Sequence, residues 1–203
     1  PGRCPMDGTS GGRRDAAAGQ SGHGRSMEQK TSEPAAGPAA GPRAYGFLTA
    51  VESGPHGIFG GYLLVDALGR PLEFHCTAPV KVTRAQQILF GATLQSHLHG
   101  QQIGATLLAE GTVAPEVVLT DCQPMLHVRG HTSLPIALVR DGAEPTDPSG
   151  GGFMAGKTLV SPHASDASRV DALRERLAEL AAAVDLREPF ERIRAAIDEA
   201  QRH

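Results

Sequence analysis

The chain has 203 residues, of which 40% are hydrophobic and 20% charged, and it contains no tryptophan. This length suits one domain rather than two, and no apolar run approaches the roughly 18 residues of a membrane-spanning helix. Residues 45–140 contain five Lys or Arg and six Asp or Glu. We therefore do not expect strong non-specific binding to nucleic acid, which normally needs clustered cations, or any association with membranes.

Only three cysteines are present, Cys4, Cys76 and Cys122, which is too few for a disulfide scaffold. No charged segment followed by an apolar run opens the chain, so no signal peptide is predicted and we expect a cytoplasmic protein. The chain starts at Pro1, and Met27 is followed by an ordinary polar stretch. We hypothesise that residues 1–26 are upstream sequence or a dispensable leader, with the native start at Met27.

Residues 1–44 are rich in Gly, Ala, Ser, Pro and Arg and lack hydrophobic periodicity, which predicts a disordered leader. An α/β domain is expected over residues 45–140. Its first strand is "YGFLTAVES", and residues 54–61 form a turn-rich bridge to the next element.

The clearest hairpin joins β-prone runs at 62–66 and 71–77 through "ALGR", where Gly69 permits a positive φ. Side chains alternate along a strand, so one face of the second run holds Leu72, Phe74 and Cys76. We expect this set to point inward. Glu73 and His75 share the other face, where they could form an acid–base pair or simply be solvated.

A helix is predicted to start after Thr83, because Gln86 three residues later completes a capping-box pattern. Gly91 and Gly100 weaken its continuity, so one broken helix and two helices fit equally. The apolar run "PEVVLTD" suits a buried central strand that ends at Asp121. One or two further strands are expected in "MLHVRGHTSLPIALV".

Residues 141–164 are interpreted as a linker and residues 165–203 as a helical hairpin. An apolar seam runs along the first of its helices; its members are Val170, Leu173, Leu177, Leu180 and Val184. Such a seam must be covered, either by the domain itself or by a protein partner, including a second copy in a homo-oligomer.

The order strand, strand, strand, helix, strand resembles the ribonuclease H-like fold over residues 46–126. "GPHGIFGGYLLVDALGRPLEF" looks like the first hairpin of that family, "TRAQ" like the start of its helix, and "VVLTDCQPML" like its fourth strand. The resemblance implies a mixed α/β sheet. A three-stranded antiparallel meander would be followed by a helix and further strands, with the helical hairpin appended at the C-terminus.

Active members of that family hold two divalent metal ions with several carboxylates, and Mg²⁺ or Mn²⁺ would be the cofactor. The resemblance places Asp121 at the end of the fourth strand and Glu52 near the first-strand position, as metal ligands and catalytic residues. Glu73 is a further catalytic candidate. Gln86 falls where the helix supplies Glu, and an amide cannot replace a charged carboxylate. A non-catalytic binding or assembly domain is therefore our leading interpretation, and a divalent-metal nuclease or phosphodiesterase is the alternative.

A second alternative is a zinc-binding protein. The central histidines are His56, His75, His97, His99, His127 and His131, and they accompany Cys76 and Cys122. Zinc ligands usually come in compact pairs, and the histidine spacings do not favour a shared face. "GGFMAGKT" satisfies phosphate-loop spacing, but no helix is expected after it, so we interpret it as part of the linker.

Overall fold

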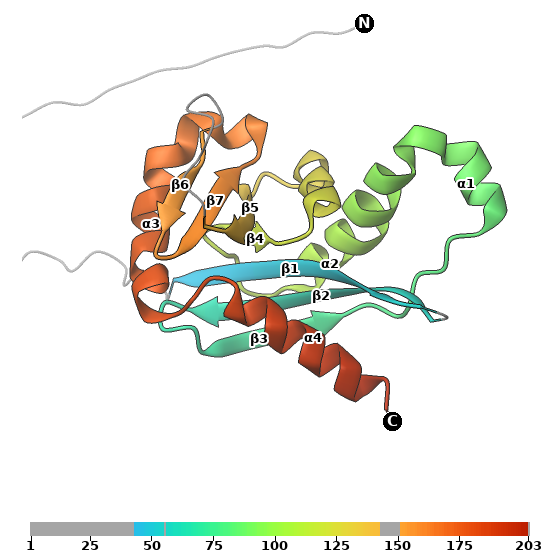
Figure 1. Ribbon diagram of the computed structural model, residues 1–203, viewed down its shortest axis with the longest axis horizontal. Helices are drawn as coiled ribbons and strands as arrows, with labels where there is room; N and C mark the ends of the chain where they lie inside the picture. Colours follow the sequence, from blue (N-terminus) through green and yellow to red (C-terminus); the bar gives the residue numbers. More distant parts are fainter. Residues whose placement is uncertain (1–42, 55, 143–150, 203) are drawn as a thin grey trace, which may run out of the picture. The chain divides into compact units, whose positions relative to one another are not determined.

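The computed structural model describes residues 43–54, 56–142 and 151–202, and these form an α/β fold around a seven-stranded mixed sheet. The strand order is β3-β2-β1-β4-β5-β7-β6. Helices cover both faces of the sheet, with α4 and α2 on opposite sides of β1 and β2 (Figure 1). The predicted fold class is confirmed, and the predicted disorder of residues 1–44 concerns residues that lie almost wholly outside the described part.

The first three strands form the predicted antiparallel meander. They are β1 (Ala44–Ser53), β2 (Gly57–Asp66) and β3 (Pro71–Cys76). Gly69 adopts a φ of 76° in the turn, and Asp66 Oδ1 accepts hydrogen bonds from the amides of Leu68 and Arg70, both at 2.9 Å. The hairpin prediction is confirmed, whereas the expected turn-rich bridge proves to contain the first half of β2.

Two glycines in β2 explain that difference. A Cβ at Gly60 would collide with Ile103 on one face of the sheet, and a Cβ at Gly61 would collide with Ile193 on the other. Glycines that look like turn formers in the sequence here permit helices to approach a strand closely from both sides.

After β3 the chain leaves the sheet and forms a projecting helical segment. It comprises α1 (Arg84–Phe90), η1 (Gly91–Thr93), η2 (Ser96–Ala105) and α2 (Thr106–Glu110). The predicted capping box is present: Gln86 N donates to Thr83 Oγ1 at 3.2 Å, and Thr83 N donates to Gln86 Oε1 at 2.9 Å. Gly91 ends α1 with a φ of 48°, as expected of a break, whereas Gly100 lies inside η2 without interrupting it.

The central strand is β4 (Val118–Thr120), which is wholly buried and runs parallel to both β1 and β5 (Ile136–Asp141). Asp121 follows it directly, as predicted. The segment expected to supply one or two strands contains only β5, because η3 (Gln123–His131) is helical. Met125 and Val128 are spaced for one helical face, and both are buried.

The linker prediction for residues 141–164 is wrong for the residues that the structure describes. β6 (Phe153–Ala155) and β7 (Thr158–Pro162) form a hairpin, and β7 pairs antiparallel with β5. Gly156 takes a φ of 62° in the two-residue turn, and Phe153 and Val160 are buried. The "GGFMAGKT" stretch is therefore a β-hairpin and not a phosphate loop.

The C-terminal hairpin is confirmed and packs on the same sheet. After the short η4 (Ala164–Arg169), its helices are α3 (Val170–Ala183) and α4 (Glu188–Ala200). Leu173, Leu177 and Leu180 are buried in one core with Tyr45 and Phe47 of β1. The seam proposed for a partner is thus covered by this chain's own sheet, with Val170 and Val184 partly buried at its ends.

Side-chain alternation divides the sheet between two cores. Phe47 and Leu119 face α3 and α4, whereas Leu48 and Val118 face η2, α2 and η3. Phe47 meets Phe190 of α4 edge-to-face, with 5.3 Å between ring centroids. Among the helices that the structure describes, none is long and apolar enough to cross a membrane.

Candidate functional site

The first candidate site lies at the carboxyl end of β4, where α/β proteins often place ligand-binding residues. Phe47 pairs with Leu119, so two residues further along Thr49 lies beside Asp121. Thr49 Oγ1 donates to Asp121 Oδ1 at 2.6 Å, and Arg194 Nη2 of α4 forms an ion pair with Asp121 Oδ2. We call these three residues the Asp121 site. Both carboxylate oxygens are already occupied by the chain's own side chains.

The other two predicted carboxylates do not join Asp121. Glu52 lies three residues after Thr49, so it points to the opposite face of the sheet, and it is exposed. Glu73 lies on β3, which is separated from β4 by two strands, or about 14 Å at ordinary strand spacing. Gln86 caps α1, outside the sheet. The catalytic set implied by the resemblance is therefore dispersed.

A polar cavity of about 490 Å³ adjoins the Asp121 site. Its charged lining residues are Asp121, Asp141, Glu191, Arg140, Arg187 and Arg194. Arg187 forms an ion pair with Asp141, and Arg140 Nη2 donates to Gln123 Oε1 at 3.2 Å. Three cations facing three carboxylates make this cavity neutral overall, so it is poorly suited to a polyanion such as nucleic acid.

Glu73 and His75 do come together, as the sequence suggested, but with Thr112 as a third member. The carboxylate of Glu73 accepts from the Thr112 hydroxyl, from Thr112 N at 2.9 Å and from Val113 N at 3.1 Å, and His75 Nε2 lies 3.0 Å away. Hydrogen bonding by Thr112, followed by His75, lowers the pKa of Glu73 to about 2. A carboxylate held this firmly as an acceptor ties the loop after α2 to β3 and is a poor general base at neutral pH.

The prediction that one set of β3 side chains points inward is wrong, because the structure exposes that set. Glu73 and His75 are half-buried, whereas Leu72, Phe74 and Cys76 are exposed. The reason is that α4 packs mainly on β1 and β2 and leaves these side chains exposed. The apolar face of this strand consequently remains uncovered.

The zinc alternative receives no geometric support. In residues 43–54, 56–142 and 151–202, no three His, Cys, Asp or Glu side chains converge on a point where a metal could bind. His99 is buried with its Nδ1 unpartnered, and burial lowers its pKa. Burial also raises the pKa of the Cys122 thiol, which disfavours the thiolate that zinc requires.

Sequence reasoning missed a buried ion pair that joins η3 to η4. Asp166 is fully buried and accepts from Arg129 Nε at 2.9 Å, from Arg129 Nη2 at 3.1 Å and from the Ile136 amide at 3.2 Å. Arg129 also donates to the Thr132 carbonyl at 2.7 Å. All these contacts are made to other groups of this chain, so we interpret the pair as a structural contact between η3 and η4. Arg129 and Asp166 are 37 residues apart, so no short-range sequence pattern indicates the pairing.

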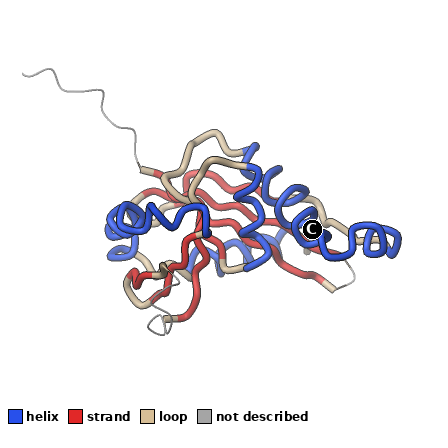
Figure 2. The backbone as a smooth tube through the Cα atoms, turned by 90° about the horizontal axis from the view of Figure 1, so that it is seen from above, coloured by secondary structure: helices blue, strands red, loops and turns tan. Residues whose placement is uncertain are grey.

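The second candidate site is a surface on residues 83–97, which we call the arm. No residue of the arm is buried, and α1 lies beyond the end of the sheet in both views (Figure 1 and Figure 2). Ile88 is 67% exposed and Leu89 82% exposed, more than the other exposed large apolar side chains. The Phe90 and His97 rings stack with centroids 4.2 Å apart, and Thr93 Oγ1 donates to the Phe90 carbonyl at 2.8 Å. These local contacts hold the arm in shape without any core beneath it.

Comparison with known proteins shows no family. No family model matches the chain, and no curated protein matches it. The X-ray crystal structure of Marinitoga piezophila Argonaute in complex with 5' OH guide RNA is similar at 11% identity, with a TM-score of 0.34 over 67% of this chain and 26% of that chain. The complex that also contains target DNA gives 12% identity and a TM-score of 0.27, over 59% and 22%.

This chain spans about a quarter of the length of those Argonaute chains. Values this low indicate nothing about this chain's fold, ligands or activity. The α/β fold itself rests on the observed strand order and directions: an antiparallel meander, a helical crossover and a parallel central strand.

Proposed function

We propose that this chain is a non-catalytic binding domain that engages a partner protein through its arm. The observation that carries the proposal is the exposure of Ile88 and Leu89, adjacent apolar residues on a capped helix that packs on no core. An isolated helix of seven residues is marginal in water, and its apolar side chains gain free energy only when another surface covers them.

The charge around the arm supports a specific partner chemistry. Residues 74–109 contain no Asp or Glu, and their only Lys and Arg are Lys81 and Arg84. A partner segment with apolar side chains between acidic residues would complement this surface, because opposite charges around an apolar centre favour encounter and fix the register. We therefore propose an acidic, apolar peptide segment as the ligand class.

The Asp121 site supports the non-catalytic part of the proposal. A metal ion would have to displace the Arg194 guanidinium and the Thr49 hydroxyl from the two oxygens of Asp121. Glu52 lies on the opposite face of the sheet and Glu73 on β3, and Asp141, which shares the cavity, is paired with Arg187. Among the residues that the structure describes, no three possible metal ligands converge. A two-metal mechanism needs several carboxylates around one point.

Selection of peptides from a random displayed library on the immobilised full chain tests the arm. We expect the enriched peptides to combine acidic residues with Leu, Ile or Phe. The double variant Ile88→Ser, Leu89→Ser should bind them at least about tenfold more weakly, since burial of each large apolar side chain contributes more than about 1.4 kcal/mol. Lys81→Glu with Arg84→Glu should weaken binding and reduce its salt dependence.

Leu68→Ser is the matched control, because Leu68 is also exposed, at 56%, but lies in the turn between β2 and β3. Binding by this control should equal that of the wild type. Peptides that bind the arm double variant as well as the wild type, or that show no acidic enrichment, would contradict the proposal.

A further inference from the structure

Strand β3 forms one border of the sheet, and no other described strand lies on its outer side. Within the part of the chain that the structure describes, β3 pairs only with β2. Thr77 N donates to the Gly60 carbonyl at 3.0 Å, which turns the backbone groups of Thr77 toward β2. Because backbone groups alternate along an antiparallel strand, those of Glu73 and His75 also face β2. The N–H and C=O groups of Phe74 and Cys76 therefore face outward, whereas Leu72 is the extra residue of a bulge, where the alternation breaks.

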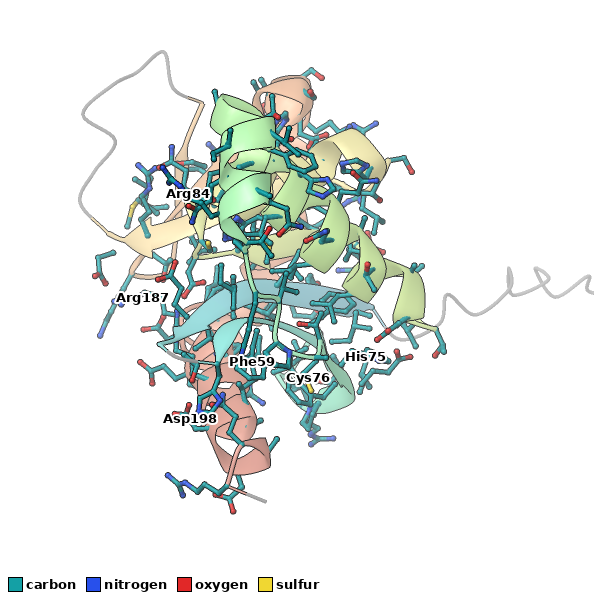
Figure 3. All side chains as sticks on the ribbon, turned by 90° about the vertical axis from the view of Figure 1, so that its right-hand side faces the viewer. Phe59, His75, Cys76, Arg84, Arg187 and Asp198 are labelled. Carbon is teal, nitrogen blue, oxygen red and sulfur yellow. The ribbon has the colours of Figure 1, made fainter. Side chains whose placement is uncertain are left out.

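The same three residues leave apolar surface uncovered. Leu72 is 41% exposed, Phe74 40%, and Cys76 is exposed as a free thiol. Figure 3 labels His75 and Cys76 on this strand and Asp198 on α4. An open edge beside exposed apolar side chains is a ready template for another strand.

Proteins usually protect such edges with lysine, proline, a bulge or a covering segment. Here Pro71 and the bulge, in which Leu72 is the extra residue opposite Leu64 and Val65, lie at the start of β3 and protect that end alone. The remaining four residues contain no Lys or Arg, and the one acidic residue among them, Glu73, is held against Thr112 on the opposite face. The unprotected length suits a short strand pair.

We propose that two copies of this chain pair antiparallel through β3, with Phe74 opposite Phe74 of the second copy. This inference goes beyond the arm proposal and does not depend on it. In this register Leu72 lies opposite Cys76 of the second copy, so apolar residues meet across the axis on one face. Glu73 lies opposite His75 of the second copy on the other face, where both side chains keep the contacts that they make within their own chain.

The backbone agrees with the same register. Residues 74 and 76 turn their polar groups outward, so the central pair of Phe74 residues can exchange two N–H···O=C bonds, with the bulge at Leu72 bounding the paired stretch. A shift by one residue would place outward-facing groups opposite inward-facing ones and would set apolar side chains against Glu73 and His75. A second copy therefore fits this edge in side-chain character and hydrogen bonding together, and it brings no unpaired charge to the contact. The helical seam first considered for self-association is already buried within the chain.

Sedimentation equilibrium of the full chain, from micromolar to submillimolar concentration, tests the proposal. We expect a reversible dimer. Phe74→Lys should raise its dissociation constant at least about tenfold, because the two-fold axis sets the two lysines directly opposite each other. Phe74 is exposed, so the variant should keep the fold, and circular dichroism verifies this.

Two matched variants locate the interface. Leu68→Lys and Ile88→Lys also place a charge on exposed apolar positions, in the turn and on the arm, and both should still dimerise. Amide exchange measured by NMR adds a second test: the amides of Phe74 and Cys76 should become protected as concentration rises, and in Phe74→Lys they should not.

A chain that remains monomeric over the whole range would overturn the proposal. So would a dimer that survives Phe74→Lys, or one that is lost in Ile88→Lys and retained in Phe74→Lys. The last result would assign self-association to the arm.

Discussion

The Asp121 site and the arm differ in whether their side chains already have partners within the chain. At the Asp121 site a carboxylate that could bind a ligand is occupied by Thr49 and Arg194 from within the chain. On the arm, Ile88 and Leu89 could have been buried in a core, and they remain exposed. The carboxylate of Asp121 is thus occupied within the chain, whereas the apolar side chains of the arm are accessible to a partner.

The two regions also differ in the contacts that stabilise them. α4 reaches the sheet through buried residues such as Phe190 and Ile193, and Arg194 adds an ion pair at the surface. The arm is held by its cap, one ring stack and a hydroxyl bond, all between residues close in sequence. Substitutions in a region held by long-range contacts are expected to lower the stability of the fold. Substitutions in a region held only by local contacts are expected to leave the core stable.

The largest expected effect is a loss in the free energy of unfolding, and it tests the contrast between the core and the arm. Leu177→Asp should lower the free energy of unfolding by at least about 4 kcal/mol, because it buries an unpaired charge in the core beneath α3. The same substitution on the arm, Leu89→Asp, should change it by less than about 0.5 kcal/mol. Urea denaturation of both variants measures the contrast. Similar losses in the two would show that the arm is part of the core.

The next effect concerns the buried joint at Asp166. Asp166→Asn should cost about 3 kcal/mol, since it leaves the Arg129 guanidinium without its carboxylate in a buried setting. Asp171→Asn is the control: Asp171 pairs with Arg174 at 2.8 Å, but its side chain is 90% exposed, so the expected loss is below about 0.5 kcal/mol. Equal melting temperatures for the two variants would disprove a structural role for Asp166.

A smaller effect appears only in acid. The pKa of Glu73 is lowered from 4.5 to about 2, so its hydrogen bonds stabilise the fold fully above pH 4.5, and this stabilisation disappears as the pH falls toward 2. Thr112→Val removes the largest cause of the shift. We expect its melting temperature to fall less steeply than that of the wild type between pH 4.5 and 2. Parallel curves would show that Thr112 does not hold the carboxylate.

The features that sequence reasoning predicted are those with a local signal. Thr83 and Gln86 are three residues apart, Asp66 and Gly69 define one turn, and the seam on α3 repeats at helical spacing. Each is visible within a few residues because local hydrogen bonding or periodicity dictates it.

The features that it missed depend on which distant segments meet. The partner of Asp121 is Arg194, which lies 73 residues away, and no spacing rule connects them. The inward-facing prediction for Leu72, Phe74 and Cys76 failed because alternation defines two faces of a strand without saying which one a helix will cover. The β6–β7 hairpin was missed because its strands are short and its glycines suggested a linker.

We propose that the Asp121 site is a joint between α4 and the sheet and not a metal centre. Incubation of labelled RNA–DNA hybrids with Mg²⁺ or Mn²⁺ tests it in the wild type, in Arg194→Gln, which frees the carboxylate, and in Asp121→Asn. We expect no cleavage above the protein-free level by any of the three. Metal-dependent cleavage by the wild type that disappears in Asp121→Asn would contradict it.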